Sequence, residues 1–392
     1  MGCMFYSSVP GKLSLQPGSL HLASRMPCLA LLAGTLVLLA ACASSSRSRE
    51  RVDPDVARAE IERLLPTKVP NPSGWAVDIF AAFEALEIAP SADNVCAVVG
   101  LTDQESNFQA DPPVPGLPGI ARKEIDARAA SHNVPRVVVS AALELRSPNG
   151  MTYRERLANA RTERALSELY EDFIGMVPLG GRLFANLNPV RTGGPMQVSI
   201  AYAQQHADRK RYPYPMTGNV RNEVFTRRGG MYFGIAHLLD YPVPYDDMLF
   251  RFADYNAGHY ASRNAAFQNA VNIVTGKKLA LDGDLLREGS SEPSNTELAI
   301  RTVAGRLDLS DAQIRSALER GEDADFERTN LYSRMFALAD QAPPGRPVPR
   351  AMVPRIRLES PKITRRLTTD WFARRVKARY EQCLARSARG GA

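Results

Sequence analysis

The sequence predicts a mainly α-helical protein in the part of the chain that follows residue 52. Apolar residues recur there at spacings of three and four, helix-capping patterns recur, and long alternation of polar and apolar residues is rare. The first two features are typical of amphipathic helices, and alternation is typical of half-buried strands. With 44% hydrophobic and 23% charged residues, the composition is that of a globular protein and excludes a disordered or fibrous chain. We expect residues 53–392 to form a single domain.

The N-terminal segment has the features of an export signal. Fifteen uncharged residues, CLALLAGTLVLLAAC, run from Cys28 to Cys42. A helix needs about 20 apolar residues to cross a bilayer, so this run fits the core of a signal peptide better than a membrane span. A plain N-terminal anchor helix is the alternative interpretation.

The end of this run, Leu39-Ala40-Ala41-Cys42, resembles the lipobox of bacterial lipoproteins. The resemblance implies that residues 1–41 are a lipoprotein signal peptide and that Cys42 receives diacylglycerol, which anchors the chain to a membrane. Ala43 stands where lipoproteins kept at the inner membrane carry Asp, so the resemblance implies the outer membrane of a Gram-negative cell. Residues 42–52 are then the lipidated cysteine and a flexible polar tether.

The charge of the chain is mildly basic. The sequence has 49 Lys and Arg against 42 Asp and Glu, a net charge of +7. Residues 1–41 contribute Lys12 and Arg25 and no acidic residue, so the remaining 351 residues carry only +5. This excess favours attraction to anionic cell-envelope polymers and is too small to indicate a nucleic-acid partner.

The first helices are predicted from start signals and apolar spacing. Asp53 followed by Pro54 is an N-cap with proline at the first helical position, and apolar residues continue to Leu65. The same spacing predicts a second helix over residues 73–86 and a third that begins near Ser91.

Later parts of the chain repeat these signals. Ser294 and Ser310 are each followed three residues later by Glu or Gln, which predicts capping boxes. Apolar residues four apart predict a last helix around residues 372–383. Two proline-rich stretches interrupt the helices, and we expect residues 110–119 to be an ordered loop and residues 342–354 a connector before the last helix.

Glu105 lies in the segment DQESNF, at the end of the predicted third helix. With 3.6 residues per turn, it shares a helix face with Asn94, Val98 and Leu101. Partial desolvation on such a face raises the pKa of a carboxyl group and suits a general acid near neutral pH. A surface glutamate near a helix end is the alternative.

Two further motifs follow Glu105 in the chain. GGPMQVS, residues 193–199, is predicted at a helix start, and YNAG, residues 255–258, is predicted to end a helix at Gly258. In this order the three motifs resemble the signature of soluble lytic transglycosylases and of goose-type lysozymes. The resemblance implies a lysozyme-like helical domain that binds the glycan strands of peptidoglycan.

The resemblance also implies roles for single residues. Glu105 would be the catalytic acid and base, Met196 and Gln197 would line the sugar cleft, and Tyr255 would hydrogen-bond beside the acid. Ser106 and Asn256 match motif positions and are expected to support substrate binding.

One glutamate suffices in lytic transglycosylases because the substrate's own N-acetyl group and 6-hydroxyl replace the second carboxylate of most glycosidases. The product is a 1,6-anhydromuramyl end. Hydrolysis is the alternative and needs a water, with Asp254 as a possible second carboxylate. Glu105 and Gln197 lie 92 positions apart, more than in the domains they resemble, so we expect a large insertion that either lengthens the cleft or closes it.

A resemblance over nearly the whole mature chain is to the YaiW-type lipoproteins of Gram-negative outer membranes, a family of unknown function. It is carried by Asn94-Val95-Cys96 and by QESNFQADP, NPVRTGGPMQVSIA, RFADYNAG, SRNAAFQNAV, LALDGDL and LESPKITRRLTT. The family leaves a second function open, a non-catalytic envelope protein that acts as a scaffold or as an accessory to peptide uptake through a protein partner.

Two cysteines remain in the mature chain besides the lipidated one. Cys3 and Cys28 leave with the signal, and in an oxidising compartment Cys96 and Cys383 are expected to form a disulfide. The histidines lack the spacing of a zinc site, and Asp282-Gly283-Asp284 is predicted to be a turn rather than a calcium loop. We expect no metal and no other cofactor.

Overall fold

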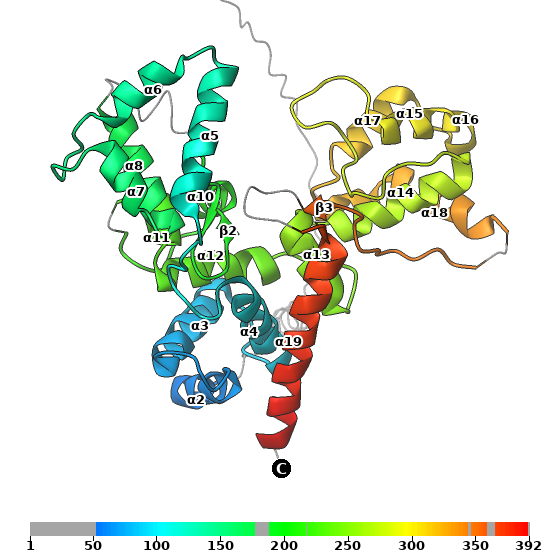
Figure 1. Cartoon of the computed structure of the whole chain (residues 1–392). Coiled ribbons are helices and arrows are strands. Elements are labelled where there is room, and N and C mark those ends of the chain that lie inside the picture. Colours follow the sequence, from blue (N-terminus) through cyan, green and yellow to red (C-terminus); the bar gives the residue numbers. More distant parts are fainter. Residues whose placement is uncertain (1–51, 177–187, 217, 344–345, 359–364, 391–392) are drawn as a thin grey trace, which may run out of the picture. The chain divides into compact units, whose positions relative to one another are not determined.

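The computed structural model describes residues 52–176, 188–216, 218–343, 346–358 and 365–390. The predicted signal peptide, residues 1–41, and the lipobox Cys42 lie outside the described residues, as does the tether apart from Val52. Asp53–Ala392 forms one compact unit. It is mainly helical, as the sequence predicts (Figure 1).

Three helices open the unit: α2 (Pro54–Leu64), α3 (Pro72–Leu86) and α4 (Ala92–Ser106). Asp53 caps α2 by accepting a hydrogen bond from the Asp55 amide at 2.8 Å, as predicted. Helix α4 begins next to Ser91, where the sequence places its start, and Ser91 is its cap. Helix α3 begins one residue earlier than predicted, because the Asn71 side chain supplies the cap by accepting from the Gly74 amide.

Among the described residues between Glu105 and the Met-Gln motif, where the sequence predicts an insertion, the chain forms four helices. They are α5 (Leu117–Ser131), α6 (Arg136–Leu143), α7 (Tyr153–Asn159) and α8 (Glu163–Gly175). The loop predicted over residues 110–119 is too long, since Gly116 adopts a left-handed conformation and α5 starts directly after it with proline in its first turn.

A short antiparallel hairpin carries the Met-Gln motif. Strand β1 (Thr192–Gly193) pairs with β2 (Val198–Ser199), with Gly193 opposite Val198. The predicted helix start at this motif is wrong: Gly194 and Gln197 both have positive φ, which makes a turn, and the helix begins only after the Ser199 cap.

The chain then forms α10 (Ile200–Arg209), α11 (Val220–Val224), α12 (Arg227–Leu239) and α13 (Met248–Ala257). Gly258 ends α13, as predicted, with a φ of 108°. These helices share one apolar core with α2, α3, α4 and the last helix of the chain.

A second apolar core is built by α14 (Ala261–Thr275), α15 (Asn295–Arg301), α16 (Ala304–Leu307), α17 (Asp311–Leu318), the 3-10 helix η2 (Ala324–Arg328) and α18 (Asn330–Gln341). The predicted capping box is complete at Ser310. At Ser294 only half of it forms, because the Glu297 carboxylate pairs with Arg301 and Arg315 instead.

The chain returns to the first core through β3 (Arg357–Leu358), which pairs antiparallel with β4 (Leu367–Thr368), and α19 (Thr369–Gly390). Helix α19 packs along α4 and α13 (Figure 1). Among the described residues no helix has both the length and the apolar character needed to cross a membrane.

Candidate functional site

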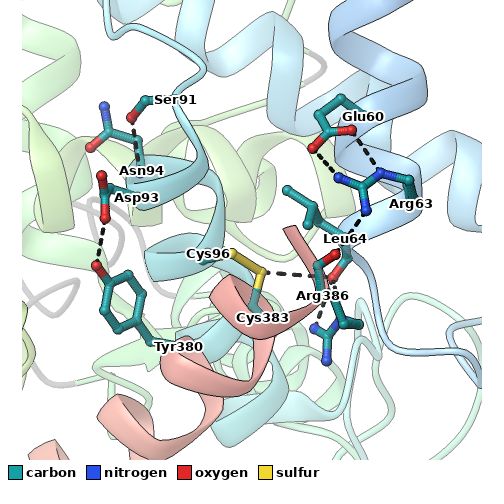
Figure 2. Close-up of a disulfide and its surroundings, with 10 residues drawn as sticks. All are labelled: Glu60, Arg63, Leu64, Ser91, Asp93, Asn94, Cys96, Tyr380, Cys383 and Arg386. Atoms are coloured by element: carbon teal, nitrogen blue, oxygen red, sulfur yellow. Dashed lines mark hydrogen bonds and ion pairs between the residues drawn. A yellow bond between two sulfur atoms is a disulfide. The ribbon is translucent and has the colours of Figure 1, made fainter. Parts of the chain in front are cut away.

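The predicted disulfide between Cys96 and Cys383 is present and ties α4 to α19, with a Cα–Cα distance of 5.3 Å. Both cysteines are fully buried. Figure 2 shows that polar contacts flank the bond: the Tyr380 hydroxyl donates to Asp93 at 2.8 Å, and the Arg386 guanidinium donates to the Leu64 carbonyl. Helix α19 is therefore fastened to both α4 and α2.

Gly100 sets how closely the two helices approach. A Cβ atom at this position would lie 2.8 Å from the backbone nitrogen of Tyr380, so only glycine fits without displacing α19. One turn further along, Asp103 pairs with Arg379 at 2.8 Å. Cys96, Gly100 and Asp103 therefore define the face of α4 that α19 covers.

Glu105 points away from that face. At about 100° per residue, the nine positions from Cys96 to Glu105 place the two side chains on opposite sides of α4. Val98 and Leu101, which share the Glu105 side, are fully buried, whereas Glu105 itself is half-buried at the C-terminal end of the helix. The position matches the partly desolvated carboxyl group that the sequence predicts.

The hairpin motif is seated on α12. The Met196 side chain is fully buried and packs against Gly234. A Cβ atom at Gly234 would lie only 2.5 Å from the Met196 sulfur. Pro195 packs in the same way against Gly230, one turn earlier in α12. Met196 is thus a core residue in this structure, and a role of its side chain in lining a sugar cleft stays a prediction. Two glycines four apart in α12 were the sequence signal for this close contact.

Gln197, by contrast, stays half-buried at the hairpin turn. Its side-chain amide donates to the Gly194 carbonyl at 3.3 Å, and its oxygen accepts from the Thr192 hydroxyl at 3.2 Å. The side chain is held in one orientation by the hairpin itself.

Tyr255 joins the three motifs. Its hydroxyl, at the end of α13, donates to the Met196 carbonyl at 2.8 Å. Burial raises the pKa of Tyr255 well above its usual value, and the nearby negative charge of Glu105 raises this pKa further. The structure therefore brings Glu105, the Met-Gln hairpin and Tyr255 together from segments 59 or more residues apart.

The two supporting residues have other partners. Ser106 is buried and its hydroxyl donates within α4 to the Thr102 carbonyl at 3.1 Å, and its supporting role in substrate binding stays a prediction. Asn256 is exposed, and its side-chain oxygen accepts from the Thr369 hydroxyl at 2.9 Å, which links α13 to the start of α19.

Asp254, the second carboxylate considered for hydrolysis, is fully buried. One of its oxygens accepts from the Ser262 amide at 2.7 Å in the first turn of α14, and the other accepts from the Tyr241 and Tyr245 hydroxyls. Burial raises the pKa of Asp254 to about 6, although these hydrogen bonds lower it in part. Its contacts are those of a helix cap between α13 and α14.

A cluster of aromatic and histidine rings, which the sequence reasoning missed, lies against Tyr255. The His237 ring is 4.7 Å from the Tyr255 ring, 4.4 Å from Tyr202 and 4.6 Å from His259. His259 stacks on Tyr241 at 3.9 Å. Burial lowers the pKa of His237 to about 3 and that of His259 to about 4, so both imidazoles are neutral at pH 7.

Two pockets lie elsewhere. One of about 250 Å³ sits beside α14 and is lined by the side chains of the predicted turn at Asp282 and Asp284. That turn forms as expected, since Gln268 bridges it by donating to Asp282 at 2.7 Å and accepting from the Gly283 amide. A smaller pocket lies between α4 and α19. Within the described ranges, no group of three or more His, Cys, Asp or Glu residues could hold a metal ion.

Comparison with known proteins gives two matches. Residues 68–386 match a family described as "Protein of unknown function (DUF1615)". Over 354 residues the chain is 51% identical to "Uncharacterized protein YaiW" of Escherichia coli (strain K12), which covers 89% of this chain and 96% of that protein. No solved structure matches. The match to YaiW confirms the family resemblance found in the sequence.

Proposed function

The chain belongs to DUF1615, a family of unknown function, and for this member we propose a cell-envelope lipoprotein that binds peptidoglycan glycan strands and cleaves them by lytic transglycosylation through Glu105. The proposal includes a lysozyme-like character for the part of the domain that carries the three motifs, with the helices α5 to α8 as an insertion.

The observation that carries the proposal is the meeting of three motifs at one place. Glu105 is half-buried at the end of α4, and the charge it bears acts on Tyr255. Tyr255 in turn donates to the carbonyl of Met196 in the hairpin. A chance occurrence of three short motifs would not predict that they pack together.

The chemistry follows from a single carboxyl group. Protonated Glu105 donates its proton to the glycosidic oxygen while the bond from that oxygen to C1 breaks, and the carbonyl oxygen of the substrate's N-acetyl group bonds to C1. The 6-hydroxyl of the same sugar then attacks C1 and displaces the N-acetyl oxygen, and the Glu105 carboxylate takes the hydroxyl proton. The enzyme ends in its starting state, and the product is a 1,6-anhydro sugar.

Hydrolysis is disfavoured as the alternative reaction. It needs a carboxylate that can activate a water, and the candidate Asp254 is fully buried and caps α14. Transglycosylation does not need this group, because the attacking hydroxyl belongs to the substrate.

The location in the envelope is part of the proposal. The lipobox at Cys42 supports attachment to the outer membrane, and a disulfide between Cys96 and Cys383 fits an oxidising compartment. Replacement of Cys42 by Ala should release the protein from membrane fractions. If the Cys42→Ala variant sediments with membranes like the wild type, lipid attachment at Cys42 is wrong.

The reaction is tested by incubating purified peptidoglycan sacculi with the chain and with Glu105→Gln, and by analysing the released muropeptides by mass spectrometry. We expect anhydromuropeptides from the wild type and none from Glu105→Gln. Asp103→Asn is the matched control, because Asp103 is in the same helix but pairs with Arg379 on the α19 side.

Absence of product from folded wild-type protein would overturn the enzymatic proposal. Binding of sacculi without cleavage would then favour the second function, a non-catalytic envelope scaffold.

A further inference from the structure

The ring cluster beside Tyr255 has no assigned role in the reaction proposed above. Its members come from separate elements: Tyr202 from α10, His237 from α12, and Tyr241 and His259 from the segments that follow α12 and α13. Consecutive ring centroids are 3.9 to 4.6 Å apart along Tyr202, His237, His259 and Tyr241. We call these four residues the ring platform.

The ring platform reaches the protein surface. Tyr202, His237 and His259 are each half-buried, so part of each ring is accessible to solvent. Tyr255 connects the platform to the candidate acid, because its ring lies 4.7 Å from that of His237 and its pKa is raised by the negative charge of Glu105.

The platform also has unused hydrogen-bonding capacity. The His237 Nδ1 atom is buried and has no partner among the described residues. His259 donates from Nε2 to the His237 carbonyl at 2.8 Å, but within that same described part of the chain neither its Nδ1 atom nor the Tyr202 hydroxyl makes a hydrogen bond. The His259 Nδ1 atom and the Tyr202 hydroxyl, which belong to half-buried rings, are therefore available to a ligand, whereas the His237 Nδ1 atom is enclosed.

The neutral rings of the platform and their unpartnered polar atoms together indicate what kind of ligand it would bind. Neutral rings present apolar edges and faces, which suit the C–H face of a pyranose and the methyl of an acetamido group. Their free nitrogen and hydroxyl atoms suit sugar hydroxyls. A metal ion is a poor fit, since no three ligating side chains converge in the described residues, and neutral imidazoles have no charge with which to attract an anion.

We propose that the ring platform of Tyr202, His237, His259 and Tyr241 is a binding subsite for one N-acetylhexosamine unit of a β-linked glycan, placed so that the next glycosidic bond reaches Glu105. This inference rests on the proposed function for the position of the bond to be cleaved. Binding of the sugar itself does not require that Glu105 be catalytic.

The test measures binding of tetra-N-acetylchitotetraose, and of purified glycan strands, to the full chain by isothermal titration calorimetry. Tyr202→Leu removes the aromatic ring and retains apolar volume. Tyr380→Leu is the matched control, since Tyr380 is also half-buried but lies on α19, across α4 from Glu105. Glu105→Gln removes the candidate acid without touching the platform.

We expect Tyr202→Leu to weaken binding about tenfold, which is the usual contribution of one well-packed aromatic contact. Tyr380→Leu should bind like the wild type. His259→Gln keeps a side-chain donor but loses the ring, and it should weaken binding by a similar factor. This second variant keeps the test valid if Tyr202→Leu does not fold.

The outcomes separate the two proposals. If the wild type binds neither probe, or if Tyr202→Leu and His259→Gln bind both as tightly as Tyr380→Leu, the platform is not a sugar subsite. If binding depends on the platform but sacculi yield no anhydro product, the subsite stands and the catalytic proposal fails. If Tyr202→Leu and His259→Gln cleave glycan with the same KM as the wild type, the catalytic proposal stands and the subsite is overturned.

Discussion

Substitution of Gly100 by alanine tests how the α4 helix is held. The new Cβ would lie 2.8 Å from the Tyr380 nitrogen and 3.2 Å from both the Tyr380 Cα and the Val376 carbonyl oxygen. All three are backbone atoms of α19, so relief requires the whole helix to move rather than one side chain to rotate. The disulfide at Cys96 and the Asp103 ion pair with Arg379 resist that movement on either side.

The expected change in the free energy of unfolding of Gly100→Ala is the sum of two opposing effects. Overpacking of a well-packed interface costs about 1–3 kcal/mol. Replacement of glycine by alanine inside a helix stabilises the helix by at most about 1 kcal/mol. Gly100→Ala should therefore lower the free energy of unfolding by about 1–2 kcal/mol. Gly119→Ala in α5 is the control, because no atom lies within 4 Å of its new Cβ, and it should be neutral or stabilise by up to about 1 kcal/mol.

The assay is urea unfolding followed by far-ultraviolet circular dichroism, with both variants and the wild type under oxidising conditions. The two substitutions are chemically identical and should have opposite signs. If Gly100→Ala is as stable as the wild type, or is stabilised as much as Gly119→Ala, the close approach of α4 and α19 at Gly100 is wrong.

Three further predictions concern stability. The disulfide joins residues 287 positions apart, so the double variant Cys96→Ala and Cys383→Ala should lose roughly 5 kcal/mol by chain entropy; an unchanged urea midpoint would contradict this. His259 titrates near 6.5 when unfolded but at about 4 when folded, so acid favours the unfolded state as the pH falls below 6.5. His259→Gln should make the loss of stability between pH 6.5 and 5 shallower by about 1 kcal/mol per pH unit, and equal slopes would refute the buried neutral histidine. Tyr255→Phe leaves the Met196 carbonyl of the hairpin without its donor and should lower the free energy of unfolding by about 1–3 kcal/mol, measured by thermal or urea unfolding. A loss below about 0.5 kcal/mol would mean that water replaces the hydroxyl.

Local features of the fold could be predicted from sequence because they depend on neighbouring residues. The Asp53 and Ser91 caps, the end of α13 at Gly258 and the buried side of α4 follow from spacing and capping chemistry within one or two turns. The disulfide was predictable for a different reason, since only Cys96 and Cys383 remain once the signal and the lipobox are set aside.

Features that depend on distant parts of the chain could not be predicted in this way. Met196 is a core residue because Gly234, 38 positions later, leaves space for its side chain. The ring platform joins segments that are far apart in sequence, so its histidines show no pattern along the chain. Two positive φ angles turned the predicted helix start at the Met-Gln motif into a hairpin, and conformations of this kind leave little trace in residue types other than glycine.

The most direct test of the proposed reaction is to digest sacculi in oxygen-18 water and to weigh the new glycan ends by mass spectrometry. Transglycosylation through Glu105 predicts ends that are one water lighter than the hydrolysed form and contain no oxygen-18, and Glu105→Gln should produce none of them. Ends that carry oxygen-18, or equal amounts of product from the wild type and Glu105→Gln, would contradict the proposed role of Glu105.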